Sequence, residues 1–133
     1  MKIIICLDER NGYMFNNRRQ SMDRELRKQL LLLLEGKPLW MSEYTKRQFT
    51  EEGNYVVDDE YEKNALADDY CFIENKGYDI KGCKEIIVFR WKRKYPFDKA
   101  FSVDFEKEGF KQEVARVFDG SSHEEILLEI YRR

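Results

Sequence analysis

The chain has 133 residues, of which 42% are hydrophobic and 38% are charged, a composition that excludes a disordered segment and predicts one globular domain over residues 1–133. Its 24 lysines and arginines nearly balance its 26 aspartates and glutamates, so the net charge of -2 indicates neither a nucleic-acid nor a membrane partner. The longest apolar run, at 30–34, is too short to span a bilayer and the three cysteines show no CxxC spacing, so we expect a cytoplasmic protein with reduced thiols and no metal site.

The first part of the chain alternates predicted strands and helices. Residues 2–7 are continuously apolar and largely β-branched, which predicts a strand buried on both faces, and a polar, irregular loop at 13–20 follows it. A helix with Ser21 as its N-cap then runs to about residue 35, and its leucines recur at helical spacing over a stripe that can pack against a sheet. The stripe consists of Leu26, Leu30, Leu31, Leu32, Leu33 and Leu34.

The remaining elements are shorter, and the chain ends in strands. We predict strands at 38–41, 55–57, 70–73, 85–91 and 101–105, short helices at 42–49 and 60–66, and a closing antiparallel hairpin of 109–118 and 125–131. Residues 42–45 turn into the first of these helices, which runs through Phe49, and Thr45 is its candidate cap. An α/β first half therefore gives way to a β-rich end.

Three stretches of the sequence resemble motifs of one known protein family, and they occur in the order in which that family has them. They are Leu-Asp-Glu-Arg-Asn-Gly at 7–12, Lys-Pro-Leu-Trp-Met-Ser at 37–42, and Ser-His at 122–123 followed by Glu-Ile-Tyr-Arg-Arg at 129–133. Together they resemble the dihydrofolate reductase family over most of the chain. The resemblance implies an α/β, dihydrofolate reductase-like three-layer sandwich with a central mixed, mainly parallel sheet and a C-terminal antiparallel hairpin.

Asp23 is the catalytic candidate that the resemblance implies. It lies about as far beyond the first strand as the family's helix carboxylate, which implies hydrogen bonds to a pair of amino nitrogens on a pteridine-like ligand. The alternative is structural, because an aspartate in the first turn of a helix accepts from unpaired backbone N–H groups whatever the function.

The loop before this helix contains the ligand-binding candidates Asn17, Arg18, Arg19 and Gln20. Adjacent arginines next to a helix N-terminus can hold a phosphate or a carboxylate. The family has an apolar loop here, so this change predicts a more polar cleft and a more anionic ligand. A solvated loop without a ligand is the alternative.

The cofactor side of the family pattern is only partly kept. The family holds NADPH phosphates with a Gly-Arg-x-Thr turn, where this chain has Ser-Glu-Tyr-Thr at 42–45, and with a Gly-Gly pair that is absent here. By resemblance Thr45, Asn75 and Gly77 are the cofactor-binding candidates. Glu43 would repel a 2′-phosphate, so we expect an impaired NADPH site.

Three classes of function stay open. The first is a small-molecule binding protein for a pteridine- or nucleotide-like ligand, or an atypical reductase. The second is a nucleic-acid or protein interaction module that uses residues 90–95, where four basic residues accompany Trp91 and Tyr95. A charged edge strand explains the same stretch without any partner. The third is a purely structural partner for another chain, which an exposed patch at Trp91 or Phe97 would indicate.

The single histidine and the cysteines have no predicted catalytic role. His123 follows two serines and is interpreted as a turn residue. Cys6 and Cys71 lie in apolar strands and are expected to be buried thiols. Cys83 is expected to be more exposed, a setting in which its pKa can be lowered.

Overall fold

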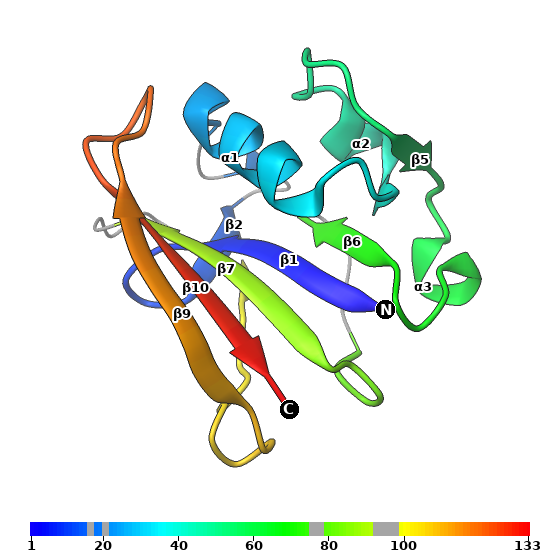
Figure 1. Cartoon of the computed structure of the whole chain (residues 1–133), viewed down its shortest axis with the longest axis vertical. Coiled ribbons are helices and arrows are strands. Elements are labelled where there is room, and N and C mark those ends of the chain that lie inside the picture. The colour runs from blue at the N-terminus through cyan, green and yellow to red at the C-terminus, as the bar shows by residue number, and fades with distance from the viewer. Residues whose placement is uncertain (16–17, 20–21, 75–78, 92–98) are drawn as a thin grey trace.

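The computed structural model describes residues 1–15, 18–19, 22–74, 79–91 and 99–133, which form a large sheet, a small sheet and three helices (Figure 1). The large sheet has the strand order β5-β4-β6-β1-β7-β10-β9, and the small sheet has the order β3-β2-β8. The strands are β1 (Lys2–Leu7), β2 (Gly12–Phe15), β3 (Arg18–Arg19), β4 (Leu39–Met41), β5 (Tyr55–Val57), β6 (Tyr70–Ile73), β7 (Glu85–Trp91), β8 (Lys99–Ala100), β9 (Lys111–Phe118) and β10 (Ile126–Arg132). The helices are α1 (Arg24–Leu34), α2 (Glu43–Lys46) and α3 (Tyr61–Asn64).

β1 lies in the interior of the large sheet. It pairs in parallel with β6 on one side and with β7 on the other, and β4 and β5 extend the parallel part. β10 is antiparallel to β7 and to β9, so the chain ends in the predicted hairpin. The structure confirms the α/β class, the mixed, mainly parallel sheet, and the strands predicted at 2–7, 55–57, 70–73 and 85–91.

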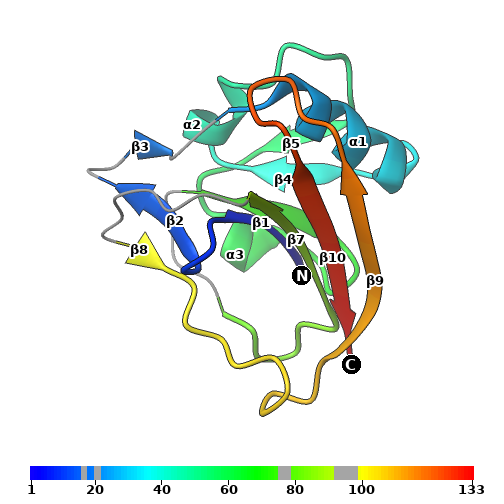
Figure 2. The same cartoon turned by 90° about the vertical axis from the view of Figure 1, so that its left-hand side faces the viewer.

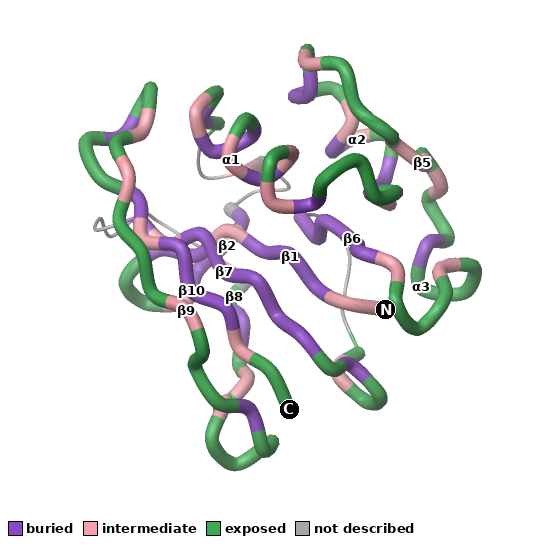
Figure 3. Tube along the Cα trace, in the orientation of Figure 1, coloured by how far each residue is buried: buried purple, intermediate pink, exposed green. Residues whose placement is uncertain are grey.

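The core lies in two layers, one on each face of the large sheet, and the burial of the central strands is visible in Figure 3. Side chains alternate along β1, so Ile4 packs with Leu26 and Leu30 of α1, whereas Ile3 and Ile5 pack in the cluster on the other face. All five side chains are at most 3% exposed. Burial on both faces explains why β1 is apolar from Ile3 to its end.

α1 begins at Arg24 because Asp23, and not Ser21, is its N-cap. The Asp23 carboxylate accepts a hydrogen bond from the backbone N–H of Leu26 at 2.9 Å, and Ser21 lies outside the described residues. Leu32 is 63% exposed, so the predicted apolar stripe is too wide at this residue. No helix in the described ranges is long and apolar enough to cross a membrane.

Three further sequence predictions were wrong in detail. Residues 13–20 are not irregular throughout, because β2 pairs with both β3 and β8 in the small sheet (Figure 2). Residues 101–105 form a loop in place of a strand, and Phe101 packs from it into the core on the face away from α1. The cap of α2 is Ser42, whose hydroxyl accepts the N–H of Thr45, so Thr45 is not the cap.

The C-terminus of α1 holds a non-glycine residue in left-handed backbone. Glu35 has φ 51° and ψ 41°, a conformation that costs a side chain about 1 kcal/mol relative to glycine. We expect Glu35→Gly to raise the free energy of unfolding by about 0.5–1 kcal/mol in urea denaturation. Lys28→Gly, at an exposed position within the same helix, should lower it by about 1 kcal/mol. An equal loss in both variants would contradict strain at Glu35.

Candidate ligand-binding site

Asp23, the predicted catalytic carboxylate, lies between the first turn of α1 and the loop that joins β9 to β10. Its oxygens accept hydrogen bonds from the backbone N–H groups of Leu26 (2.9 Å), Ser121 (2.9 Å) and Ser122 (2.8 Å). The N–H of His123 adds another at 3.2 Å, and the Ser122 hydroxyl, which also contacts the Met22 carbonyl, lies 3.1 Å from Asp23 Oδ2. Burial opposes ionisation, but these donors hold the pKa of Asp23 well below its usual range. Asp23 is 3% exposed, and its contacts are those of a helix cap, which is the structural alternative.

His123 lies in the same loop, as expected of a turn residue, and is buried there. Its ring stacks on Trp91, with centroids 4.7 Å apart and planes 11° apart, and its Nδ1 lies 3.3 Å from Asp23 Oδ2. Of the 90–95 stretch considered for nucleic-acid binding, the structure describes Arg90 and Trp91. Trp91 is 3% exposed, so its ring is not available for stacking on a base.

Arg19, one of the predicted ligand-binding residues, forms an ion pair with Glu74 at the end of β6. Its Nε lies 2.9 Å from Glu74 Oε2 and its Nη2 lies 3.1 Å from Oε1, so the pair is bidentate. Nη2 also donates to the Tyr44 carbonyl at 2.9 Å, and the guanidinium lies 4.3 Å from the Tyr44 ring centroid. Burial raises the pKa of Glu74, while hydrogen bonds from Arg19, Thr45 and Gln48 oppose that rise. Arg19 therefore connects β3 to α2 and β6.

The other predicted site residues are described only in part. Arg18 pairs with Phe15 in the small sheet. Asn17, Gln20, Asn75 and Gly77 lie outside the described residues. Thr45 is fully buried, and its hydroxyl contacts Ser42 Oγ at 3.2 Å and the Glu74 carboxylate. This burial beside an acidic group does not fit contact with an NADPH phosphate.

The cysteines lie in or next to the core. Cys83 is 1% exposed and burial raises its pKa, so the expectation of a more exposed thiol with a lowered pKa was wrong. Burial also raises the pKa of Cys6, and that of Cys71 to about 12. No group of three or more His, Cys, Asp or Glu side chains arranged to hold a metal ion is present in the part of the chain that the structure describes.

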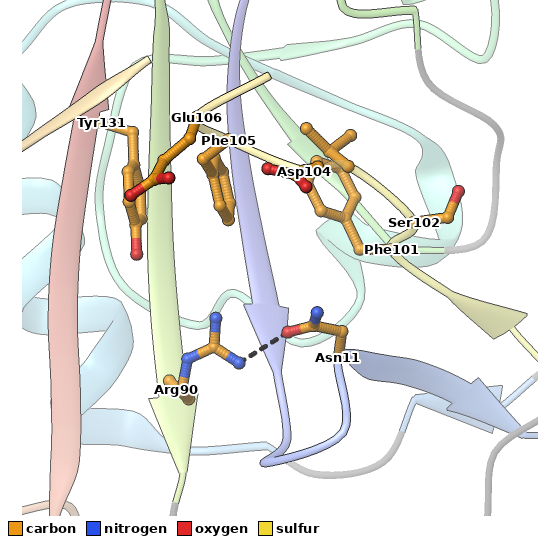
Figure 4. Close-up of a pocket in the computed structure, with 9 residues that line it drawn as sticks. Asn11, Arg90, Phe101, Ser102, Asp104, Phe105, Glu106 and Tyr131 are labelled. Carbon is orange, nitrogen blue, oxygen red and sulfur yellow. Dashed lines mark hydrogen bonds between the residues drawn. The ribbon is translucent and has the colours of Figure 1, made fainter. Parts of the chain in front are cut away.

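A cavity of about 630 Å³ opens on the face of the sheet away from α1 (Figure 4). Phe89 and Trp91 of β7 pack toward α1, so strand alternation directs Arg90 to the other face. The cavity is lined by Asn11, Arg90, residues 101–106 and Tyr131, and we call it the Arg90 cavity. Its volume is in the range of sites that hold small organic molecules, about 300–1,000 Å³.

Two donor groups at the floor of the Arg90 cavity are free to meet a ligand. Arg90 donates from Nε to Glu129 (2.9 Å) and from Nη1 to Asn11 Oδ1 (2.7 Å), and Nη1 also donates to the Asp8 carbonyl (3.0 Å). Within the described ranges neither Arg90 Nη2 nor Asn11 Nδ2 has a hydrogen-bond partner. Figure 4 shows both nitrogen atoms directed toward the aromatic rings across the cavity. The Arg90 side chain is 20% exposed, so solvent and a ligand can reach it.

Aromatic rings form the opposite wall. The rings of Phe105 and Tyr131 stack with centroids 3.9 Å apart, and the Phe101 ring centroid lies 6.1 Å from that of Phe105. Asn11, Phe105 and Tyr131 were not predicted as site residues from the sequence. One signal was available, because Asn11 lies in the turn after the central strand, and loops at the carboxyl ends of parallel strands tend to line ligand sites.

Comparison with known proteins adds no family to these observations. No protein-family model matches this chain, and the curated proteins contain no match to it. The Arg90 cavity is therefore interpreted from its own chemistry.

Proposed function

We propose that this protein binds a small organic molecule in the Arg90 cavity. The observation that carries the proposal is the pair of unpartnered donors, Arg90 Nη2 and Asn11 Nδ2, which point into the cavity from its floor. Donors that converge beside aromatic rings in a cavity of this size are typical of small-molecule sites, where few polar groups fix the orientation of a largely apolar ligand.

A dihydrofolate reductase-like three-layer sandwich is part of the proposal. Its support is the order of elements: a buried β1, a polar segment, an α1 capped by Asp23, a Lys-Pro-led β4 and the terminal hairpin of β9 and β10. α1 covers one face of the sheet, and α3 and residues 101–110 cover the other.

Ligand binding in the Arg90 cavity is better supported than a reductase reaction in which Asp23 contacts the substrate. The oxygens of Asp23 are occupied by internal donors, and Thr45 is buried beside Glu74. A pteridine- or nucleotide-like ligand and an atypical reductase are the alternatives. The buried Trp91 gives no support to a nucleic-acid module.

The proposal is tested by two-dimensional NMR with a panel of aromatic fragments, pteridines, nucleotides and NADPH. We expect shift changes at Asn11, at the Arg90 Nε–H and along residues 101–106. Asn11→Gly removes Nδ2 together with the Oδ1 that accepts from Arg90, but Arg90 keeps Glu129 and the Asp8 carbonyl. The backbone φ of 61° at Asn11 suits glycine, so the fold should persist while binding weakens about fivefold, equivalent to one hydrogen bond of about 1 kcal/mol.

Asn64→Gly, at an exposed position in α3, is the control and should leave binding unchanged. The proposal fails if no compound shifts the residues of the Arg90 cavity. Saturable shifts around Arg19 and Asp23 with NADPH or a pteridine would favour the reductase alternative.

A further inference from the structure

Three carboxylates accompany the guanidinium of the Arg90 cavity. Glu129 pairs with Arg90 Nε at 2.9 Å, and its other oxygen accepts from the Tyr131 hydroxyl at 2.9 Å. Asp104 and Glu106 also line the cavity. Arg90 is the one cation among its described lining residues, so the local charge is negative and favours a cation over an anion.

Glu106 is the carboxylate best placed to meet a ligand. It is exposed, and its carboxylate has no hydrogen bond or ion pair within the described part of the chain. Asp104, in contrast, accepts the N–H of Lys107 at 3.3 Å. Figure 4 shows the Glu106 side chain beside the Tyr131 ring, on the cavity side of the loop. A protonated amine in the cavity can therefore pair with Glu106.

At the floor of the cavity a ligand must supply a hydrogen-bond acceptor instead of a positive charge. Arg90 Nη2 and Asn11 Nδ2 are donors and need an acceptor. A neutral acceptor such as a carbonyl satisfies them without placing a second negative charge near Glu129, which already neutralises Arg90. The half-buried ring of Phe105, which stacks on Tyr131, offers contact to a flat ring.

We infer that the ligand of the Arg90 cavity is a flat aromatic ring that carries an alkylamine group, protonated at neutral pH, at one end and a neutral hydrogen-bond acceptor such as a carbonyl at the other. Its acceptor meets Asn11 and Arg90, its ring lies against Phe105, and its ammonium pairs with Glu106. This inference rests on the proposed function, because it names the ligand class of the same cavity.

Four probes that differ in one end at a time test the inference by NMR titration. They are 4-(aminomethyl)benzamide, benzylamine without the acceptor, 4-methylbenzamide without the amine, and 4-methylbenzoate, in which the acceptor is anionic and the amine is absent. We expect 4-(aminomethyl)benzamide to bind most tightly and 4-methylbenzoate most weakly. Loss of the carbonyl should weaken binding about fivefold and loss of the ammonium about threefold.

Two variants test which residue contacts each end of 4-(aminomethyl)benzamide. Glu106→Gln should weaken 4-(aminomethyl)benzamide about threefold and leave 4-methylbenzamide unchanged. Asn11→Gly should weaken both benzamides about fivefold and leave benzylamine unchanged. Glu52→Gln, at an exposed glutamate outside the cavity, is the matched control and should change none of the four affinities.

The outcomes separate this inference from the proposed function. Binding of 4-methylbenzoate at least as tight as that of the amines would overturn the ligand class, while the cavity stays a small-molecule site. The same holds if other compounds of the larger panel bind in the cavity but none of the four probes does. If no compound of either panel shifts the residues of the cavity, the proposed function fails and the inference fails with it.

Discussion

Replacing Asp23 with alanine is expected to lower the free energy of unfolding by about 3–5 kcal/mol. The substitution leaves the N–H groups of Leu26, Ser121, Ser122 and His123 without their shared acceptor, and buried donors without partners each cost about 1–3 kcal/mol. Chemical denaturation measures the loss, which is large because one carboxylate joins the start of α1 to the loop between β9 and β10.

The same carboxylate makes stability depend on pH in a defined direction. Because the folded-state pKa of Asp23 lies below its usual value, ionised Asp23 stabilises the fold above about pH 5, and this contribution is lost as pH falls through about 4 and below. Asp23→Asn should therefore lose less stability than the wild type between about pH 5 and pH 2.

A matched control separates this effect from general acid unfolding. Asp68→Asn, at an exposed aspartate, should keep both the stability and the pH profile of the wild type. If Asp23→Ala is as stable as the wild type but no longer binds a ligand, Asp23 is a ligand contact and the capping role assigned to it is wrong.

Asp23 shows what spacing along the chain can and cannot predict. Its place at the start of a helix indicated a cap, and the family resemblance indicated a ligand contact. The residues that decide between them, Ser121, Ser122 and His123, lie about a hundred positions away in the chain. No local pattern places that loop against α1, because the contact depends on β10 pairing with β7.

Strands buried on both faces were the most predictable part of the fold. β1 from Ile3 to Leu7 and β7 from Ile86 to Phe89 are continuous apolar runs. The boundaries of both strands match the prediction because these runs pack on both faces of the sheet. The 101–105 segment has a similar apolar content but packs from a loop, since its rings reach the core without a strand partner in the described part of the chain. Residues of that loop line the Arg90 cavity. The cavity was not predicted from the sequence, because a strand was expected at 101–105.

Glu74 was missed for a related reason. It directly follows the buried β6, and a single acidic residue in that position is typical of a turn. Its importance comes from Arg19 and Tyr44, which reach it from other elements. The pKa values of the two buried carboxylates, Asp23 and Glu74, shift in opposite directions. At Asp23 the N–H donors outweigh burial and lower the pKa, whereas at Glu74 burial outweighs the Arg19 guanidinium and two further hydrogen bonds and raises it.

Removal of Arg19 is the second large expected effect. Arg19→Met leaves Glu74 buried without its cation, which should lower the free energy of unfolding by about 3–5 kcal/mol at pH 8. The pKa of Glu74 is already raised in the folded protein, and loss of Arg19 raises it further. The cost of burying ionised Glu74 is therefore present above the usual carboxyl pKa, and it falls as Glu74 becomes protonated at lower pH. Arg19→Met should consequently regain stability on going from pH 8 to pH 5, which urea denaturation at each pH measures.

The double variant Arg19→Met/Glu74→Met distinguishes an ion pair from lost packing. Replacing both charges with apolar side chains of similar length removes the stranded carboxylate, so the double variant should be more stable than Arg19→Met at pH 8 and should lack its pH dependence. Arg116→Met, at an exposed arginine of β9, is the control and should change stability by less than about 0.5 kcal/mol. If Arg19→Met is equally unstable at both pH values, the loss comes from the contact of Arg19 with Tyr44, and Glu74 is not the group that makes Arg19 necessary.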